Sequence, residues 1–364
     1  MSLIHNPQHD IVICTLNRYD SLNRLLKSLS DCTDPKSARV IIIDSTKSNK
    51  NRDKIAEFIC KTFHVDSLVV YFDKGLPSCR NKALEFLQSP LVHFLDDDIT
   101  VESNYLQSID RHFKQFVEIS GTGPLIENLY KKKEASFLSR AFSLDPHKHA
   151  GKLTKSGRNF WIPDLPETFP RTVVDWIPGC SMIFRSHIFS EFQFNTNLEK
   201  GPGQNYALGE DVDFGWRVSR KYKLDFTSEV KIQHHLEASK RDNKKLMLRA
   251  SGVWLAYLRR LTAGHVSYSR IMFEHTAIYL FHMLSYLKSF FHTLIHLIPI
   301  RLTLRLIRRP HKFFYVAASF KIHAYQSMKQ FLRLSILSST ISRDFLIFMY
   351  SFHREIIRKK IKVI

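Results

Sequence analysis

Three consecutive carboxylates, Asp96, Asp97 and Asp98, directly follow the apolar run Leu91–Leu95. A short apolar run of this kind is typical of a buried strand, so the carboxylates emerge where that strand ends. Side chains two residues apart on a strand face the same side, which lets Asp96 and Asp98 hold one hard cation. Mg²⁺ and Mn²⁺ suit such a site because they accept carboxylates together with substrate phosphates. The alternative is a solvated acidic turn.

A second acidic group, Glu210, Asp211 and Asp213, follows Gly209 and opens a predicted helix. Carboxylates in a first helical turn are favoured by the helix dipole, so helix capping is one interpretation. Catalysis is the other, because removing the proton of an attacking hydroxyl group needs a carboxylate base within hydrogen-bond reach of that hydroxyl. The pair Glu210 and Asp211 is the best candidate for such a base in the chain.

Two adjacent histidines, His234 and His235, end the predicted strand Leu224–Gln233. Imidazole binds Mn²⁺, so one of the two rings can be a third metal ligand. We take His235 as the predicted ligand, although the pattern itself does not decide between it and His234. A structural or solvent-facing role is the alternative for each ring.

Short apolar runs alternate with helix-like stretches over residues 10–125. The runs are Ile11–Leu16, Val40–Asp44, Ser67–Phe72 and Leu91–Leu95, and the helix-like stretches are Ser21–Leu29, Asp53–Phe63 and Ser78–Gln88. This alternation predicts an α/β fold with a doubly wound, mostly parallel, Rossmann-like sheet. Such a sheet binds its ligand at the carboxyl ends of the strands, which is where the three aspartates lie.

The rhythm breaks at residues 126–172, where we expect a long loop because lysines, histidines and prolines replace the apolar runs. Apolar order resumes at Val173–Phe184. A helix is predicted from Glu210 to Lys221, and the strand Leu224–Gln233 follows it.

The net charge of +20 is concentrated in the last third of the chain. Residues 241–364 hold 22 Lys and Arg against 4 Asp and Glu, so the first 240 residues are nearly neutral. Such an asymmetry predicts two parts in different surroundings. We predict a catalytic domain over residues 1–240 and a helical, basic region over residues 241–364.

The basic region combines cationic side chains with apolar ones, most clearly over residues 301–314. Anionic lipid attracts such segments by about 1 kcal/mol per Lys or Arg near the surface. Charges recur too often for a clean membrane span, although Ala277–Ile300 is borderline, so we expect interfacial helices on a membrane surface with anionic lipid. No nucleic-acid partner is expected, because no recognisable nucleic-acid module accompanies the charge. A plain helical domain with a solvated basic face is the remaining alternative.

The five cysteines are scattered without paired spacing, which is typical of reduced thiols in the cytosol; they are Cys14, Cys32, Cys60, Cys79 and Cys180. The N-terminus shows no signal peptide. We therefore expect a cytoplasmic protein that lies peripherally at the inner face of the cell membrane.

Six segments, in this order, resemble the motif set of family 2 glycosyltransferases with the GT-A fold, including the bacterial polysaccharide and rhamnosyl types. They are Ile11–Arg18, Ile43–Ser45, Gly75–Asn81, Asp96–Asp98, Trp176–Cys180 and Gly209–Arg217. The resemblance covers roughly residues 10–240. It does not extend to the basic C-terminal region.

The resemblance implies a role for several residues on the donor side of the site. Thr15, Asn17 and Arg18 would line the nucleoside pocket, with Asp44 reading the base, Arg80 near the diphosphate and Asp96 facing the ribose and the metal. Cys79 departs from the family, which often has a smaller residue at this position, but the departure leaves Arg80 in place.

On the metal and acceptor side, the resemblance implies that Asp98 holds the metal directly. It makes Asp211 the catalytic base, with Glu210 beside it. Trp176 and Gly179 would border the acceptor.

These roles together predict an inverting glycosyltransferase that depends on Mg²⁺ or Mn²⁺. The donor would be a UDP-, dTDP- or GDP-linked sugar, and the acceptor a glycan or a lipid-linked glycan in cell-surface polysaccharide synthesis. A nucleotidyltransferase is one alternative, but it usually carries a Gly-rich phosphate loop, and none follows Leu16. A non-catalytic scaffold that binds sugar nucleotide or glycan is the other alternative. Loss of the metal or base carboxylates would have favoured it, but both sets are present.

Overall fold

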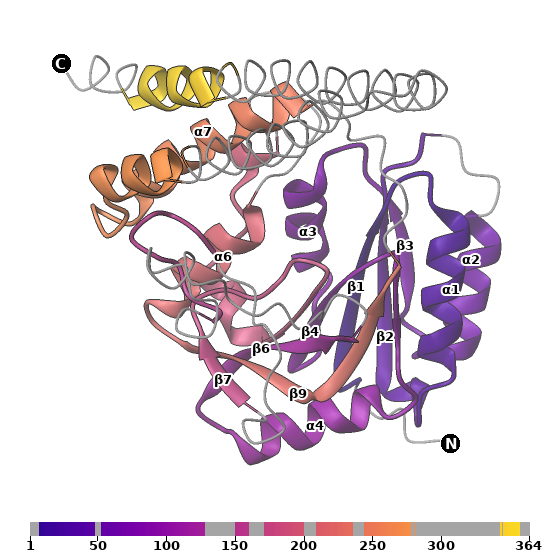
Figure 1. The fold of residues 1–364 in the computed structure, drawn as a ribbon. Coiled ribbons are helices and arrows are strands. Elements are labelled where there is room, and N and C mark those ends of the chain that lie inside the picture. The colour runs from indigo at the N-terminus through magenta and orange to yellow at the C-terminus, as the bar shows by residue number, and fades with distance from the viewer. Residues whose placement is uncertain are drawn as a thin grey trace, which may run out of the picture. The chain divides into compact units, whose positions relative to one another are not determined.

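The computed structural model describes residues 7–47, 52–127, 150–159, 171–199, 209–235, 244–277, 280, 343 and 345–356 (Figure 1). The chain divides into two compact units, Met1–Asn243 and Lys244–Ile364. The division lies close to the domain boundary that the charge pattern predicts.

The first unit is built on a nine-stranded sheet. Its strands are β1 (His9–Thr15), β2 (Ala38–Asp44), β3 (Leu68–Tyr71), β4 (Leu91–Asp96), β5 (Ile99–Val101), β6 (Ile119–Ile126), β7 (Arg171–Val174), β8 (Ser181–Arg185) and β9 (Lys223–His234). Their order is β3-β2-β1-β4-β8-β6-β9-β5, and β7 also pairs with β9. Strands β8, β5 and β7 run antiparallel to their neighbours, and the other six strands share one direction.

Helices cover both faces of this sheet. They are α1 (Tyr19–Ser30), α2 (Arg52–Thr62), α3 (Leu76–Leu84), α4 (Tyr105–Gln115) and α6 (Glu210–Ser219). Apolar side chains of α1, α2 and α4 form one core cluster with the sheet, and those of α3 and α6 form a second cluster. In α1 the cause is visible in the sequence, because Leu22, Leu25, Leu26 and Leu29 recur at helical spacing and are all buried. The predicted α/β class with a doubly wound, mostly parallel sheet is confirmed.

The predicted elements before residue 96 all form, with ends that shift by a few residues. Three further elements, β5, α4 and β6, were not predicted. Strand β6 contains Gly121, Gly123 and Pro124, residues that weaken the sequence signal of a strand. Its glycines are used for close packing, since a Cβ at Gly121 would lie 2.4 Å from the ring of Phe184 on β8.

Residues 128–149 and 160–170 of the predicted loop lie outside the described part of the chain. The described segment between them holds an isolated β-bridge between Leu153 and Asn159.

The second unit contains the helix α7 (Lys244–Leu261) and a helical segment at residues 345–356. Phe348 and Phe352 of this segment are buried, and a Cβ at Gly252 of α7 would lie 2.8 Å from the carbonyl oxygen of Phe348. Among the described helices, none is long and apolar enough to cross a membrane. Apart from Ala277 and Leu280, the borderline span 277–300 and the basic segment 301–314 lie outside the described residues.

The contact of α6 with the segment before β8 gives a stability prediction. At Gly215 an added Cβ would lie 2.6 Å from the backbone Cα of Trp176, so Gly215→Ala must displace α6. Alanine favours a helix over glycine by about 1 kcal/mol, yet we expect overpacking to dominate and lower the free energy of unfolding by about 1–3 kcal/mol. Urea unfolding measures this, with Ser219→Ala on the same helix as the control. A Gly215→Ala variant more stable than wild type would show that α6 is not seated this closely.

Candidate functional site

The predicted donor residues meet at one edge of the sheet because neighbouring parallel strands end there together. Strand β1 pairs with both β2 and β4, and the register sets Thr15 beside Asp44 and Cys14 beside Asp96. The turn from Asp96 to Asp98 leads directly into β5. The three aspartates therefore lie at the carboxyl end of β4, as the sequence predicts.

The middle aspartate, Asp97, points toward β1 and anchors the turn. It accepts a hydrogen bond from the hydroxyl of Thr15 at 2.7 Å and one from Nη1 of Arg18 at 3.2 Å. Burial raises the pKa of Asp97 above its ordinary value, while these two donors oppose the rise. No role is predicted for Asp97 from the sequence, although side-chain alternation along a strand already sets it apart from Asp96 and Asp98.

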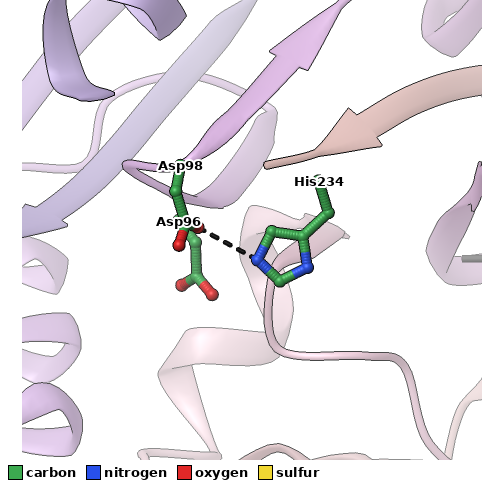
Figure 2. A group of neighbouring side chains, drawn as sticks. All are labelled: Asp96, Asp98 and His234. Carbon is green, nitrogen blue, oxygen red and sulfur yellow. Dashed lines mark hydrogen bonds and ion pairs between the residues drawn. The ribbon is translucent and has the colours of Figure 1, made fainter. Parts of the chain in front are cut away.

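Asp96, Asp98 and His234 form a group with the chemistry of a metal site (Figure 2). Each offers one ligand atom, and these atoms all lie within 4.8 Å of one another. Strand β5 brings them together, because its antiparallel pairing with β9 places Ile99 opposite His234. In Figure 2 the imidazole of His234 points at the carboxylate of Asp98, with 3.0 Å between Nε2 and Oδ1.

The ring that lies with Asp96 and Asp98 is therefore that of His234 and not that of His235, the predicted ligand. The ring of His235 lies 2.9 Å, measured from Nε2, from the hydroxyl oxygen of Thr100, and its backbone amide donates to the carbonyl of Asp98 at 2.7 Å. The position of His234 beside the aspartates depends on β5, which is only three residues long. Without that pairing the sequence cannot show which of two adjacent rings faces the aspartates.

The electrostatics of this group suit a divalent cation. Burial, together with the charges of Asp98 and Asp97, raises the pKa of Asp96 to about 6, although Arg80 opposes the rise. Burial would also raise the pKa of Asp98, but the hydrogen bond and charge of His234 outweigh burial and lower it. Two carboxylates and one imidazole at this spacing fit a cation such as Mn²⁺ or Mg²⁺, which would offset the repulsion between the carboxylates.

Asp211, the predicted base, is half-buried at the first turn of α6. Its carboxylate accepts hydrogen bonds from the backbone amides of Gly179 and Val212, each at 2.9 Å. A Cβ at Gly179 would lie 3.3 Å from Oδ2 of Asp211, so glycine permits this close approach. Burial and the neighbouring charge of Glu210 raise the pKa of Asp211 to about 7, which is the range of a general base near neutral pH.

Arg80 connects this base to the metal group. It lies on α3 and is only 2% exposed. Its Nη1 donates to Glu210 at 3.2 Å, and its Nη2 donates to Asp96 at 3.4 Å and to the carbonyl of Gly179 at 2.8 Å. The predicted catalytic pair and the predicted metal carboxylates thus belong to one network.

The predicted base-reading residue, Asp44, is 1% exposed at the end of β2. Its carboxylate accepts hydrogen bonds from the hydroxyl of Tyr19 at 3.0 Å and from Nε of Arg52 at 2.9 Å. The exposed Asn17 adopts a left-handed backbone conformation with φ of 57°. Its backbone amide donates to the hydroxyl oxygen of Thr46 at 2.9 Å. Sequence reasoning missed Tyr19, Arg52 and Thr46, because single polar residues after a strand carry no distinguishing signal.

The two residues predicted at the acceptor side differ in their surroundings. Trp176 is 3% exposed and packs against α6 at Gly215, so it has the surroundings of a core side chain. Gly179 lies directly against the carboxylate of Asp211.

Comparison with known proteins bears on the first half of this site. Residues 10–156 match the family model of glycosyl transferase family 2, which confirms the resemblance over that segment. The chain is 24% identical over 217 residues to the pre-mycofactocin glycosyltransferase of Mycobacterium tuberculosis. That alignment covers 58% of this chain and 40% of the relative, so the chain spans about two fifths of the relative's length.

Solved structures with some similarity to this chain include a mannosyltransferase from Pyrobaculum calidifontis in complex with GDP-Man and Mn²⁺. It is 11% identical, with a TM-score of 0.48 over 96% of this chain and 87% of that one. GalNAc-T7 with UDP, GalNAc and Mn²⁺ is 17% identical, with a TM-score of 0.48 over 70% of this chain and 50% of that one.

The adjacent histidines give a matched pair for testing the metal group. We expect His234→Ala to weaken Mn²⁺ binding by at least about tenfold, the lower end of the effect seen when support of a metal site is lost. We expect His235→Ala to leave Mn²⁺ binding unchanged, because its ring contacts Thr100 instead. Isothermal titration with Mn²⁺ alone measures both. The opposite ranking of the two variants would restore His235 as the ligand.

Proposed function

We propose that this protein is a glycosyltransferase that transfers a sugar from a nucleotide-linked donor to a hydroxyl group. The observation that carries the proposal is the network in which Arg80 contacts Asp96 of the metal group and, through Gly179, the Asp211 carboxylate, whose pKa is raised to about 7. The family match supports it over residues 10–156, a segment that includes Asp96 and Asp98. Asp211 and His234 lie after that segment, so their roles rest on geometry.

In the proposed reaction, Asp211 accepts the proton of the acceptor hydroxyl while the acceptor oxygen attacks the anomeric carbon of the donor. The new carbon–oxygen bond forms as the bond to the nucleoside diphosphate breaks, and the diphosphate leaves with the bonding electrons. In-line attack inverts the anomeric centre. The amides of Gly179 and Val212 hold the Asp211 carboxylate in place for this step.

Asp96, Asp98 and His234 would hold a divalent cation, Mg²⁺ or Mn²⁺, and such a cation would supply positive charge that offsets the charge of a nucleoside diphosphate. Thr15 and Arg18 hydrogen-bond to Asp97 and so hold the turn from Asp96 to Asp98 in place, which keeps the two outer aspartates of the metal group in position. This explains why residues predicted to line the donor pocket contact the aspartates directly.

The finer assignments are also proposals. The donor is a UDP-, dTDP- or GDP-linked sugar, and the acceptor is a glycan or lipid-linked glycan of cell-surface polysaccharide. A nucleotidyltransferase that attacks with a phosphate oxygen would use the same kind of metal site but would not need a base near pH 7. A non-catalytic scaffold would not need one either.

We also propose that the second unit contacts a membrane surface with anionic lipid at the cytoplasmic face. The described residues 343 and 345–356 support this, because Arg343, Leu346, Tyr350 and Arg354 recur at spacings of three or four, as in a stripe on one face of a helix. Leu346 and Tyr350 are 65% and 66% exposed, and both arginines are exposed. Apolar and aromatic side chains flanked by cations are what an interfacial helix presents to anionic lipid.

The base assignment predicts a defined pH response. Asp211 acts only when ionised, and its raised pKa means that turnover should rise as the pH increases through about 7. Asp211→Asn keeps the shape but cannot accept a proton, so we expect turnover to fall by about 10²–10⁴-fold while nucleotide binding persists. Release of nucleoside diphosphate from UDP-, dTDP- and GDP-linked sugars between pH 5.5 and 8.5 measures both effects. Turnover of the variant within a few fold of wild type would assign the base to another group.

The lipid stripe gives a second test. Leu346→Ser combined with Tyr350→Ser should reduce co-sedimentation with anionic liposomes at high salt, where screening leaves apolar burial as the main attraction. The control is Phe58→Ser, which removes an exposed aromatic side chain from α2 in the first unit. Equal loss of binding in both variants, or no loss in the double variant, would contradict the proposed stripe.

A further inference from the structure

Arg80 is the buried cation through which three separate elements meet at the site. Its guanidinium contacts Glu210 of α6, Asp96 of β4 and the carbonyl of Gly179 before β8. Its guanidinium carbon, Cζ, also lies 5.3 Å from the ring centroid of Phe194. A guanidinium that is 2% exposed needs such partners, because an unpaired buried charge costs several kcal/mol.

The backbone of Gly179 is hydrogen-bonded both to Arg80 and to Asp211. Its carbonyl accepts from Arg80 at 2.8 Å, and its amide donates to Asp211 at 2.9 Å. Glu210, the second partner of Arg80 on this side, is the residue before Asp211. The position of the Asp211 carboxylate is therefore tied to Arg80 by two routes, and that of Asp96 by a direct contact.

We propose that Arg80 is a positioning residue that fixes the Asp211 carboxylate relative to the Asp96 edge, and that its guanidinium serves these contacts instead of binding the donor diphosphate. The inference rests on the proposed function. It departs from the role near the diphosphate that the family resemblance implies for this arginine. The departure follows from burial, since the donors of Arg80 are directed at Glu210, Asp96 and Gly179.

Lysine tests the geometry while keeping the charge. An ammonium group is a compact point charge on a flexible stem and cannot reproduce a planar fork that reaches three acceptors on three elements. In Arg80→Lys the base should lose its alignment, while His234 and Asp98 keep their own contact. Small misplacements of a reacting group cost up to about 10²-fold in rate.

The experiment compares wild type, Arg80→Lys and Arg217→Lys. Arg217 is a matched control because it also makes an ion pair on α6, with Asp213 at 2.8 Å, but it contacts none of the site residues named above. Calorimetry with UDP, TDP and GDP in the presence of Mn²⁺ gives nucleotide affinity, and nucleoside diphosphate release gives kcat and KM for the sugar donor. For Arg80→Lys we expect kcat to fall by about tenfold or more, with nucleotide affinity and KM within about threefold of wild type. Arg217→Lys should match wild type in all three.

Other outcomes overturn the inference. A tenfold loss of nucleotide affinity or rise in KM with little change in kcat would mean that Arg80 binds the diphosphate, and unchanged kinetics would mean that it positions nothing. If Arg80→Lys does not fold, Glu210→Ala removes the acceptor of the same contact from α6 and must show the same separation of kcat from affinity. Wild type that binds nucleotide but never releases it from any sugar donor would instead contradict the proposed function.

Discussion

Repulsion between like charges is the constraint on which the site depends. Five carboxylates, those of Asp96, Asp97, Asp98, Glu210 and Asp211, gather at the carboxyl end of β4 and the first turn of α6, partly or wholly removed from water. Carboxylates this close cannot all stay ionised without cations, because desolvation and mutual repulsion both favour the protonated form. Burial and the neighbouring carboxylate charges raise the pKa values of Asp96 and Asp211 for this reason.

The fold offsets this repulsion with charged or hydrogen-bonding side chains from different elements. Arg18, after β1, donates hydrogen bonds to Asp97 and Asp98. The ring of His234, at the end of β9, is hydrogen-bonded to Asp98. Arg80 on α3 serves Asp96 and Glu210. Asp211 is held by backbone amides and forms no ion pair with any described residue, and burial together with the charge of Glu210 raises its pKa to about 7.

The fold and the site were predictable from the sequence to different extents. Strands β1, β2 and β4 are continuous apolar runs, so their carboxyl ends, and with them Thr15 and the aspartates, could be placed before the structure. The partner of those aspartates could not, because His234 reaches them through the three-residue strand β5, which is too short to carry a periodic signal. Arg80 was placed near the diphosphate by resemblance, and only the structure shows its contacts with Glu210 and Gly179, which lie about a hundred residues away or more.

The most direct measurement of the central claim is thermal unfolding of the full chain with nucleoside diphosphates and sugar nucleotides, each with and without Mn²⁺. A ligand that binds only the folded state raises the melting temperature, by the equivalent of about 2.7 kcal/mol at a hundred times its Kd. We predict that at least one nucleoside diphosphate and its sugar-linked form stabilise the protein in the presence of Mn²⁺ and do so far less without it. Stabilisation by none of them, or equal stabilisation with and without Mn²⁺, would contradict a cation-assisted donor site at the carboxyl end of β4.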